Sequence, residues 1–272
     1  MKSIAFAFKS LLGGVLLTGM TMASVNTQAA PAWLPRVTTT WQWQLSGTVD
    51  TKYNVNAYDI DLFDNTATTI TKLHTAGRKV ICYFSAGSSE NWRPDYKNFQ
   101  AADKGNGLSG WPGENWLDTR SVNVRSIMLS RLDLARSKGC DAVEPDNVDG
   151  YTNNPGFPLT PATQLDYNKF LATNAHSRGM AIGLKNDLDQ IVQLQPDFDF
   201  AINEQCNQYN ECGGYSVFTQ HGKPVFNAEY ARKYQNNTKG ARDQLCRASK
   251  AANIRTLVLP LNLDDSSRFS CD

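Results

Sequence analysis

The acidic stretch Val143-Glu144-Pro145-Asp146-Asn147-Val148-Asp149 forms the end of a strand predicted over residues 141–147 and the turn after it. Before it, apolar residues at helical spacing predict a helix over residues 122–138, closed by Gly139. After it, the pattern predicts a second helix over residues 161–178 and a second strand over residues 181–186. Alternation of this kind joins parallel strands through crossover helices. The stretch and its neighbours therefore predict an α/β protein.

The same alternation extends over most of the chain. Further strands are predicted over residues 38–45, 57–63, 79–85, 198–204, 224–230 and 254–261, and further helices over residues 66–76 and 239–251. A long polar loop containing Trp92, Trp111 and Trp116 follows the third strand, and a short helix is expected between the fifth and sixth strands. Eight strand units in roughly 240 residues favour a closed (β/α)8 barrel, also called a TIM barrel. We expect one barrel domain over residues 30–272.

Composition excludes several classes of function. The 272 residues carry a formal net charge of +1, which produces no field that would attract nucleic acid or an anionic membrane. No glycine-rich phosphate-binding motif follows any predicted strand. The three histidines are scattered, and no pair of cysteines has the spacing of a zinc site. We therefore expect no metal, no cofactor and no nucleic acid partner.

The N-terminal residues have the composition of a secretory signal peptide. Lys2 and Lys9 precede a short apolar run over residues 11–17, and the small residues Ala29 and Ala30 follow. The run is shorter than the roughly 20 residues that span a bilayer. A buried helix or an uncleaved anchor is the alternative. We expect residues 1–29 to be removed, which leaves an extracellular, slightly acidic protein without a membrane segment.

Export changes the interpretation of the six cysteines, because disulfides form in oxidising compartments. Cys206 and Cys212 bracket a short loop and are expected to pair, and Cys246 and Cys271 would tie the last helix to the C-terminal tail. Cys82 and Cys140 lie in or beside consecutive strands. For these two the sequence leaves both a disulfide and two buried thiols open.

Carboxylates gather where the predicted strands end. The acids at these ends are Asp59, Asp61, Asp64, Glu144, Asp146, Asp149, Asp187, Glu204 and Glu229. Some, such as Asp64 and Asp187, are expected to cap the following helices. The ligands of such barrels sit at the C-terminal strand ends, so the remaining acids predict a site there.

Paired carboxylates with aromatic residues suit glycoside hydrolysis, which needs one carboxylic acid and one carboxylate. Asp146 is the leading candidate for the nucleophile or base, because Pro145 holds the backbone before it. Glu204 is the candidate general acid. Strict alternation puts Glu204 on the same face as Phe200 and Ile202, so a bulge or the end of regular pairing is expected to turn it toward the site.

The sequence resembles the endo-α-1,4-polygalactosaminidases, glycoside hydrolase family 114. The most specific block is Glu144-Pro145-Asp146-Asn147-Val148-Asp149-Gly150-Tyr151. Matching segments also occur at residues 41–45, 58–64, 82–87, 92–95, 183–186 and 201–206, in family order. The resemblance implies a barrel enzyme that cleaves α-1,4-linked galactosamine polymers endo-wise. It also implies that Asp146 and Glu204 are the catalytic pair. The resemblance favours retention of anomeric configuration, but the separation of the two carboxyl groups decides between retention and inversion, and the sequence leaves it open.

A cationic galactosamine polymer requires an acidic cleft. We expect Asp61, Glu144, Asp149 and Glu229 to supply counter-charges, Tyr83 and Trp92 to stack on sugar rings, and Lys185 to point into the site. Other roles remain open at this stage. In the alternative, Glu144 pairs with Lys185 inside the barrel, and Asp61 and Asp149 cap helices or hold other site residues in place. Trp92 then packs against the long loop rather than against a sugar.

We expect a monomer whose partner is this polysaccharide. Two rival functions follow from the same residues. One is a barrel hydrolase acting on another α-linked polysaccharide, either acetylated or neutral. The other is a secreted carbohydrate-binding protein that keeps the cleft without catalysis.

Overall fold

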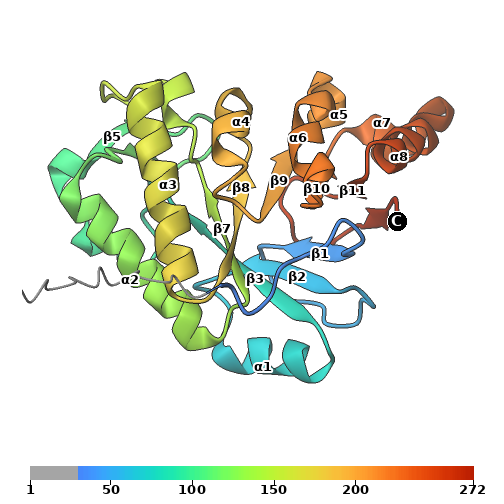
Figure 1. Cartoon of the computed structure of the whole chain (residues 1–272), viewed down its shortest axis with the longest axis horizontal. Coiled ribbons are helices and arrows are strands. Elements are labelled where there is room, and N and C mark those ends of the chain that lie inside the picture. The colour runs from blue at the N-terminus through green and yellow to red at the C-terminus, as the bar shows by residue number, and fades with distance from the viewer. Residues whose placement is uncertain (1–29) are drawn as a thin grey trace, which may run out of the picture.

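The computed structural model describes residues 30–272, so the predicted signal peptide over residues 1–29 lies outside the described residues. Eight parallel strands curl into the barrel that the sequence predicts (Figure 1). They are β1 (Trp41–Gln44), β2 (Ala57–Asp61), β3 (Lys79–Ser85), β7 (Ala142–Asp146), β8 (Ala181–Lys185), β9 (Phe200–Glu204), β10 (Val225–Glu229) and β11 (Ile254–Val258). Most are shorter than predicted, because pairing ends where polar side chains turn into the mouth of the barrel.

The seam between β1 and β11 is closed without a strand ladder between them in the described chain. Strand β12 (Phe269–Ser270) pairs antiparallel with β11. Arg268, just before β12, donates from Nη2 to the Trp41 carbonyl at 3.0 Å, and the Trp41 indole donates to the Arg255 carbonyl at 3.0 Å. The C-terminal tail, which the sequence left without structure, therefore completes the barrel wall.

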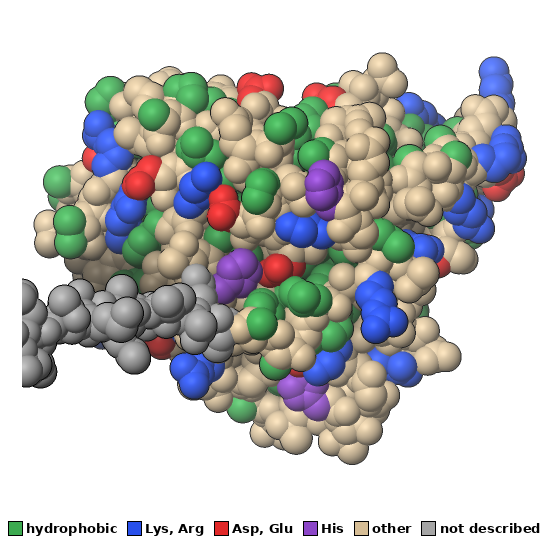
Figure 2. All heavy atoms as spheres, in the orientation of Figure 1, with side chains coloured by type: hydrophobic (Ala, Val, Ile, Leu, Met, Phe, Trp, Pro, Cys, Tyr) green, Lys and Arg blue, Asp and Glu red, His purple; other side chains and the backbone are tan. Residues whose placement is uncertain are grey.

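Helices cover the outside of the strands. They are α1 (Ala67–Thr75), α2 (Val122–Lys138), α3 (Pro161–Ser177), α4 (Ile191–Leu194), α5 (Cys206–Tyr209), α6 (Ser216–Gln220), α7 (Arg232–Gln235) and α8 (Ala241–Ala251). Their ends follow the sequence: Thr160 caps α3 through its hydroxyl with Pro161 in the first position, and Gly139 ends α2 at φ 91°. On the face seen in Figure 2, Lys and Arg are spread over the helices and gather at the edge made by α7 and α8.

Apolar side chains form two layers on either side of the strands. Outside the barrel, residues such as Ile60, Leu132 and Leu171 fill the space between strands and helices. Inside it, Trp41, Phe200 and Phe226 belong to a separate cluster. The inner layer fills the lower part of the barrel, so the strand ends above it are left for polar residues.

The long loop after β3 is the main departure from prediction. It contains a small antiparallel sheet of β4 (Ser88–Glu90), β6 (Glu114–Leu117) and β5 (Lys104–Gly107), in that order. Two buried arginines attach this loop sheet to the barrel. Arg93 forms a two-pronged ion pair with Asp61, and Arg131 donates to the Ser85 carbonyl at 2.6 Å and to Asp95 at 2.8 Å. The loop sheet thereby becomes a fixed wall above β3 and β7.

All six cysteines of the chain form disulfides: Cys82–Cys140, Cys206–Cys212 and Cys246–Cys271. The first pair joins β3 to the residue before β7, which decides the alternative that the sequence left open. Over residues 30–272 no helix has the length and apolarity to cross a bilayer.

We predict that Gly183→Ala destabilises the barrel. An added Cβ would lie 2.4 Å from Phe200 Cε2, and the Phe200 ring is itself completely buried in the inner cluster. Overpacking of this kind typically costs about 1–3 kcal/mol. Urea unfolding should show a lower midpoint at an unchanged slope. Gly213→Ala is the matched control, because its Cβ would meet nothing within 4 Å. Equal midpoints for the two variants would contradict the packing of Phe200 inside the barrel.

Candidate active site

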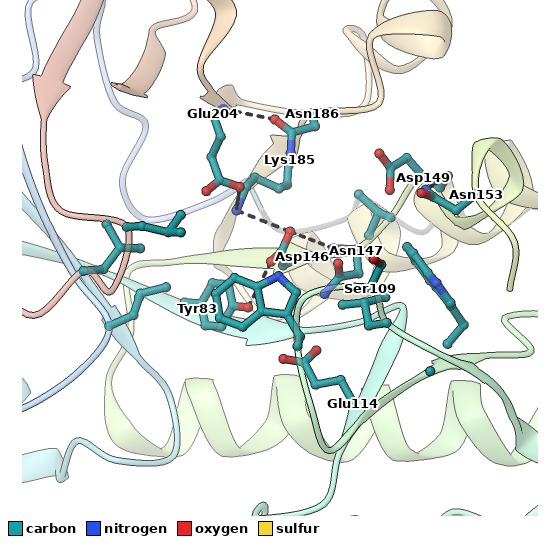
Figure 3. Close-up of a pocket in the computed structure, with 18 of the residues that line it drawn as sticks. Tyr83, Ser109, Glu114, Asp146, Asn147, Asp149, Asn153, Lys185, Asn186 and Glu204 are labelled. Atoms are coloured by element: carbon teal, nitrogen blue, oxygen red, sulfur yellow. Dashed lines mark hydrogen bonds and ion pairs between the residues drawn. The ribbon is translucent and has the colours of Figure 1, made fainter. Parts of the chain in front are cut away.

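A pocket of about 710 Å³ opens at the C-terminal ends of the strands (Figure 3). Its floor and walls come from strand ends, from the loop sheet and from the C-terminal tail. The lining residues used below are Trp43, Tyr83, Trp111, Glu114, Trp116, Asp146, Asn147, Asp149, Lys185, Asn186 and Glu204. This is the position that the barrel architecture predicts for a ligand.

Asp146 ends β7 and is held from several directions. The Tyr83 hydroxyl donates to Oδ2 at 2.9 Å, and the Asn147 amide N–H donates to Oδ1 at 2.7 Å. Burial raises the pKa of Tyr83 well above 10, so the phenol stays a donor. The Asp146 carbonyl also accepts from the Ala86 and Gly87 amides. A Cβ at Gly87 would lie 1.7 Å from the Asn147 carbonyl, so only glycine permits this contact.

Glu204 ends β9 and faces the same pocket (Figure 3). The Tyr230 hydroxyl donates to Oε1 at 2.5 Å, and burial raises the pKa of Tyr230 well above 10. The expected bulge is absent here: regular pairing continues to Glu204, opposite Ala228. Phe200 and Ile202 face the barrel interior rather than the helices, so alternation itself points Glu204 inward.

Lys185 connects the two carboxylates. Its Nζ lies 2.8 Å from Glu144 Oε1, 3.3 Å from Asp146 Oδ1 and 3.5 Å from Glu204 Oε2. Burial alone would lower the pKa of Lys185, yet the three surrounding carboxylates raise it well above its usual value. The side chain is therefore a buried ammonium whose charge is already engaged. Figure 3 shows it between Asp146 and Glu204.

The residue after each of these three side chains adopts a left-handed backbone. Asn147, Asn186 and Gln205 have φ values of 60°, 48° and 65°. Such conformations are unusual outside glycine, and asparagine tolerates them best. Asn186 also accepts the Glu204 amide N–H on its side chain at 3.1 Å. The chain turns away sharply after each functional side chain, which leaves that side chain exposed to the pocket.

Two further carboxyl groups line the pocket with altered acidity. Burial, with the charge of Asp146, raises the pKa of Asp149 to about 6. Burial raises the pKa of Glu114 to about 7, although Ser88 donates to its Oε2 at 2.6 Å. Asp149 is therefore largely ionised only above about pH 6, and Glu114 only above about pH 7.

Some residues singled out from sequence lie away from the pocket surface. Asp61 is bound to Arg93 and to backbone amides, and Glu229 is buried and accepts the Asn207 amide. Glu144 pairs with Lys185 below the floor. Trp92 is 52% exposed and is not part of the pocket lining. The structure thus brings Asp146, Glu204, Tyr83, Asp149 and Lys185 together and leaves these four outside.

Other lining residues were missed by sequence reasoning. Trp43 is one, although it lies in the segment over residues 41–45 that resembles the family. Trp111 is 50% exposed at the pocket, and Glu114 belongs to the unpredicted loop sheet. Tyr230, which does not line the pocket, was also missed: it follows β10 on the inward face with Phe226 and Ala228 and donates to Glu204. Among residues 30–272, no group of three or more His, Cys, Asp or Glu is arranged to hold a metal ion.

Known proteins share the fold of this chain. The structure of Aspergillus fumigatus Ega3 in complex with galactosamine has 48% sequence identity and a TM-score of 0.85, covering 90% of this chain and 100% of that chain. The glycoside hydrolase domain of PelA from Pseudomonas aeruginosa, at 12% identity and a TM-score of 0.63, covers 84% of this chain and 96% of its own and shows the shared fold. An uncharacterized protein of Deinococcus radiodurans is 23% identical over 223 residues, which are 71% of this chain and 72% of the other.

The model of glycoside-hydrolase family GH114 matches residues 22–272, nearly all of the chain. Together with the barrel and its carboxylate-lined pocket, this match confirms what the sequence motifs predicted: the chain belongs to glycoside-hydrolase family GH114 and is a glycoside hydrolase.

Proposed function

We propose that this protein is an endo-acting hydrolase of α-1,4-linked galactosamine polymers, with Asp146 and Glu204 as its catalytic pair. The observation that carries the proposal is the convergence of both carboxylates on one buried ammonium at the pocket floor. The relative with 48% identity was solved in complex with galactosamine, which supports the substrate class. An open pocket between strand ends and loop sheet suits a polymer that passes through rather than ends there.

The proposed mechanism retains anomeric configuration, as the family resemblance implies. The Asp146 and Glu204 oxygens that contact Lys185 Nζ at 3.3 Å and 3.5 Å lie at most roughly 7 Å apart, which allows the separation of about 5–5.5 Å found in retaining enzymes. Asp146 would act as nucleophile, because three donors orient it. Its carboxylate attacks the anomeric carbon, the glycosidic C–O bond breaks, and Glu204 gives its proton to the leaving oxygen. Water then cleaves the ester while Glu204 takes a proton back.

The pocket wall supports a cationic substrate. Asp149 and Glu114 place carboxyl groups beside the catalytic pair, and each has room to meet a sugar ammonium group. Trp111, which is half exposed at the pocket, offers an aromatic face of the kind that stacks on sugar rings, whereas Trp43 and Trp116 line the pocket as largely buried side chains. Lys185 repels an ammonium only weakly, because the Glu144 and Asp146 carboxylates balance its charge.

Secretion is part of the proposal. The signal-peptide pattern over residues 1–29 predicts export, and three disulfides are typical of oxidising compartments. A polymeric sugar is also a substrate that an exported enzyme would meet.

The first prediction from the proposed function concerns turnover. Incubation with deacetylated galactosaminogalactan should release short oligosaccharides, detected by mass analysis. Asp146→Asn should lower this rate by roughly three orders of magnitude or more, because the nucleophile is lost while the shape is kept. Asp133→Asn, an exposed acid on α2, is the control and should behave as wild type. Substantial activity in Asp146→Asn would show that Asp146 is not the nucleophile.

The same incubation distinguishes the two rival functions. Binding without any fall in polymer length would favour the carbohydrate-binding alternative, and faster cleavage of fully acetylated oligomers would favour another substrate.

The second prediction concerns stereochemistry. Proton NMR recorded during the first turnovers should show the α-anomer as the initial product of an α-linked substrate. The reason is that two successive displacements at the anomeric carbon restore its configuration. Initial appearance of the β-anomer would show that Asp146 is a base acting on water instead.

The third prediction concerns pH. The folded pKa of Asp149 is about 6, so its carboxylate is present above that pH and neutral below it. Losing this counter-charge should raise KM for cationic oligomers roughly 2- to 5-fold as pH falls through about 6, the size of a partly exposed ion pair. Asp149→Asn should show the higher KM at both pH values. A KM step of equal size in that variant would assign the effect to another group.

A further inference from the structure

Two carboxyl groups lie directly beneath the pocket floor, and the mechanism above uses neither. Asp59 of β2 and Glu144 of β7 are both completely buried. They occupy inward-facing positions on strands separated only by β3. Asp59 is level with Ala142 across β3, so Glu144 stands one inward position nearer the pocket.

Their hydrogen bonding is incomplete. Both oxygens of Asp59 and the Oε2 atom of Glu144 receive nothing from the N–H and O–H donors of the described chain. The two side chains are nevertheless within hydrogen-bonding reach of each other. Buried carboxylate oxygens are almost always paired, since stripping them of water is costly. A proton between the two groups would give a partner to two of these three atoms, namely Glu144 Oε2 and one oxygen of Asp59.

Charge balance leads to the same result. Lys185 is the cation in contact with Glu144, at 2.8 Å, and it also neutralises Asp146 and Glu204 above. Among residues 30–272, no cation forms an ion pair with Asp59. A second buried negative charge against Glu144 would have no compensation, which is strongly unfavourable in a water-free interior. One proton on the pair leaves Glu144 as the carboxylate for Lys185.

We propose that Asp59 is a neutral carboxylic acid that donates a hydrogen bond to Glu144 Oε2 and thereby positions Lys185 beneath Asp146 and Glu204. Asp59 is a positioning residue: it touches no substrate and acts through Glu144. Its influence on catalysis rests on the proposed function, whereas its protonation does not.

The surroundings of Asp59 are consistent with this assignment. The ionisable groups that act on it are Glu144 and Asp146 from β7 and Lys185 from β8, and Ile81 is its neighbour on β3. Burial first, and then the charge of Glu144, raise the pKa of Asp59 well above its usual value. Opposite it on β1 stands Trp43, whose ring does not titrate. Asp61, further along β2, is already bound to Arg93.

Protonation is tested without substrate. In protein labelled with ¹³C at aspartate Cγ, one resonance should keep the shift of a protonated carboxyl at a pH near 8.5, above the pKa values of about 6 and about 7 at Asp149 and Asp187. That resonance should vanish in Asp59→Asn. Only ionised aspartates at this pH, or survival of the signal in Asp59→Asn, would overturn the proposal.

Stability against pH gives a second readout. A raised pKa means that the folded state holds a proton that the unfolded chain releases above about pH 4. Stability from this group is therefore present below that pH and falls as pH rises, by up to tenfold in the unfolding constant per pH unit. Asp59→Asn lacks the proton and should not show this fall. Parallel pH profiles for the two proteins would contradict a neutral Asp59.

Catalysis provides the third readout. Asp59→Leu removes the donor and should lower kcat about 10- to 100-fold with little change in KM, because Lys185 loses its fixed position. Asp59→Asn keeps an N–H donor toward Glu144 and should recover most of that loss. Equal losses in both variants, with both folded, would show that Asp59 is needed as a carboxylate and would overturn the proposal. If the wild type cleaves no galactosamine polymer, the NMR and stability results still decide the protonation of Asp59.

Discussion

The ammonium of Lys185 is the interaction on which the site depends. Its charge allows Glu144, Asp146 and Glu204 to lie close together at and just below the pocket floor, since acidic groups that are wholly or partly buried repel one another strongly when ionised. The same nitrogen sets the spacing of the two proposed catalytic carboxylates. Two residues earlier on β8, Gly183 leaves room for the Phe200 ring, which packs in the inner cluster.

The scaffold exposes these groups through the way its strands end. Three strands finish on a functional side chain and turn at once through a left-handed residue. Contacts from neighbouring strands hold the turns, as in the amides of Ala86 and Gly87 that bind the Asp146 carbonyl. The strain of such backbone positions is supported by surrounding hydrogen bonds, as at many functional sites. The loop sheet, tied down by Arg93 and Arg131, adds the wall on which a polymer would lie.

Sequence periodicity predicted the eight strands and the main helices because their apolar spacing is regular. The helix over residues 122–138 and the strand over residues 79–85 match the structure residue for residue. The loop sheet was missed because strands of three or four residues, such as Lys104–Gly107, carry no alternation. The orientation of Glu204 was misjudged because aromatic residues on β9 were expected to face the helices. A closed barrel has its own apolar interior, which takes Phe200 and Ile202 instead.

The sequence by itself determined the fold class, the family and the positions of Asp146 and Glu204, because strand-end motifs are local and their order along the chain sets the barrel. Only the tertiary structure decided which acids meet. Asp61 binds Arg93, Glu144 binds Lys185, and Trp111 rather than Trp92 reaches the pocket. Each of these outcomes depends on distances between residues far apart in the chain. Such distances follow from barrel closure and from the neutralisation of buried charge, which no local pattern encodes.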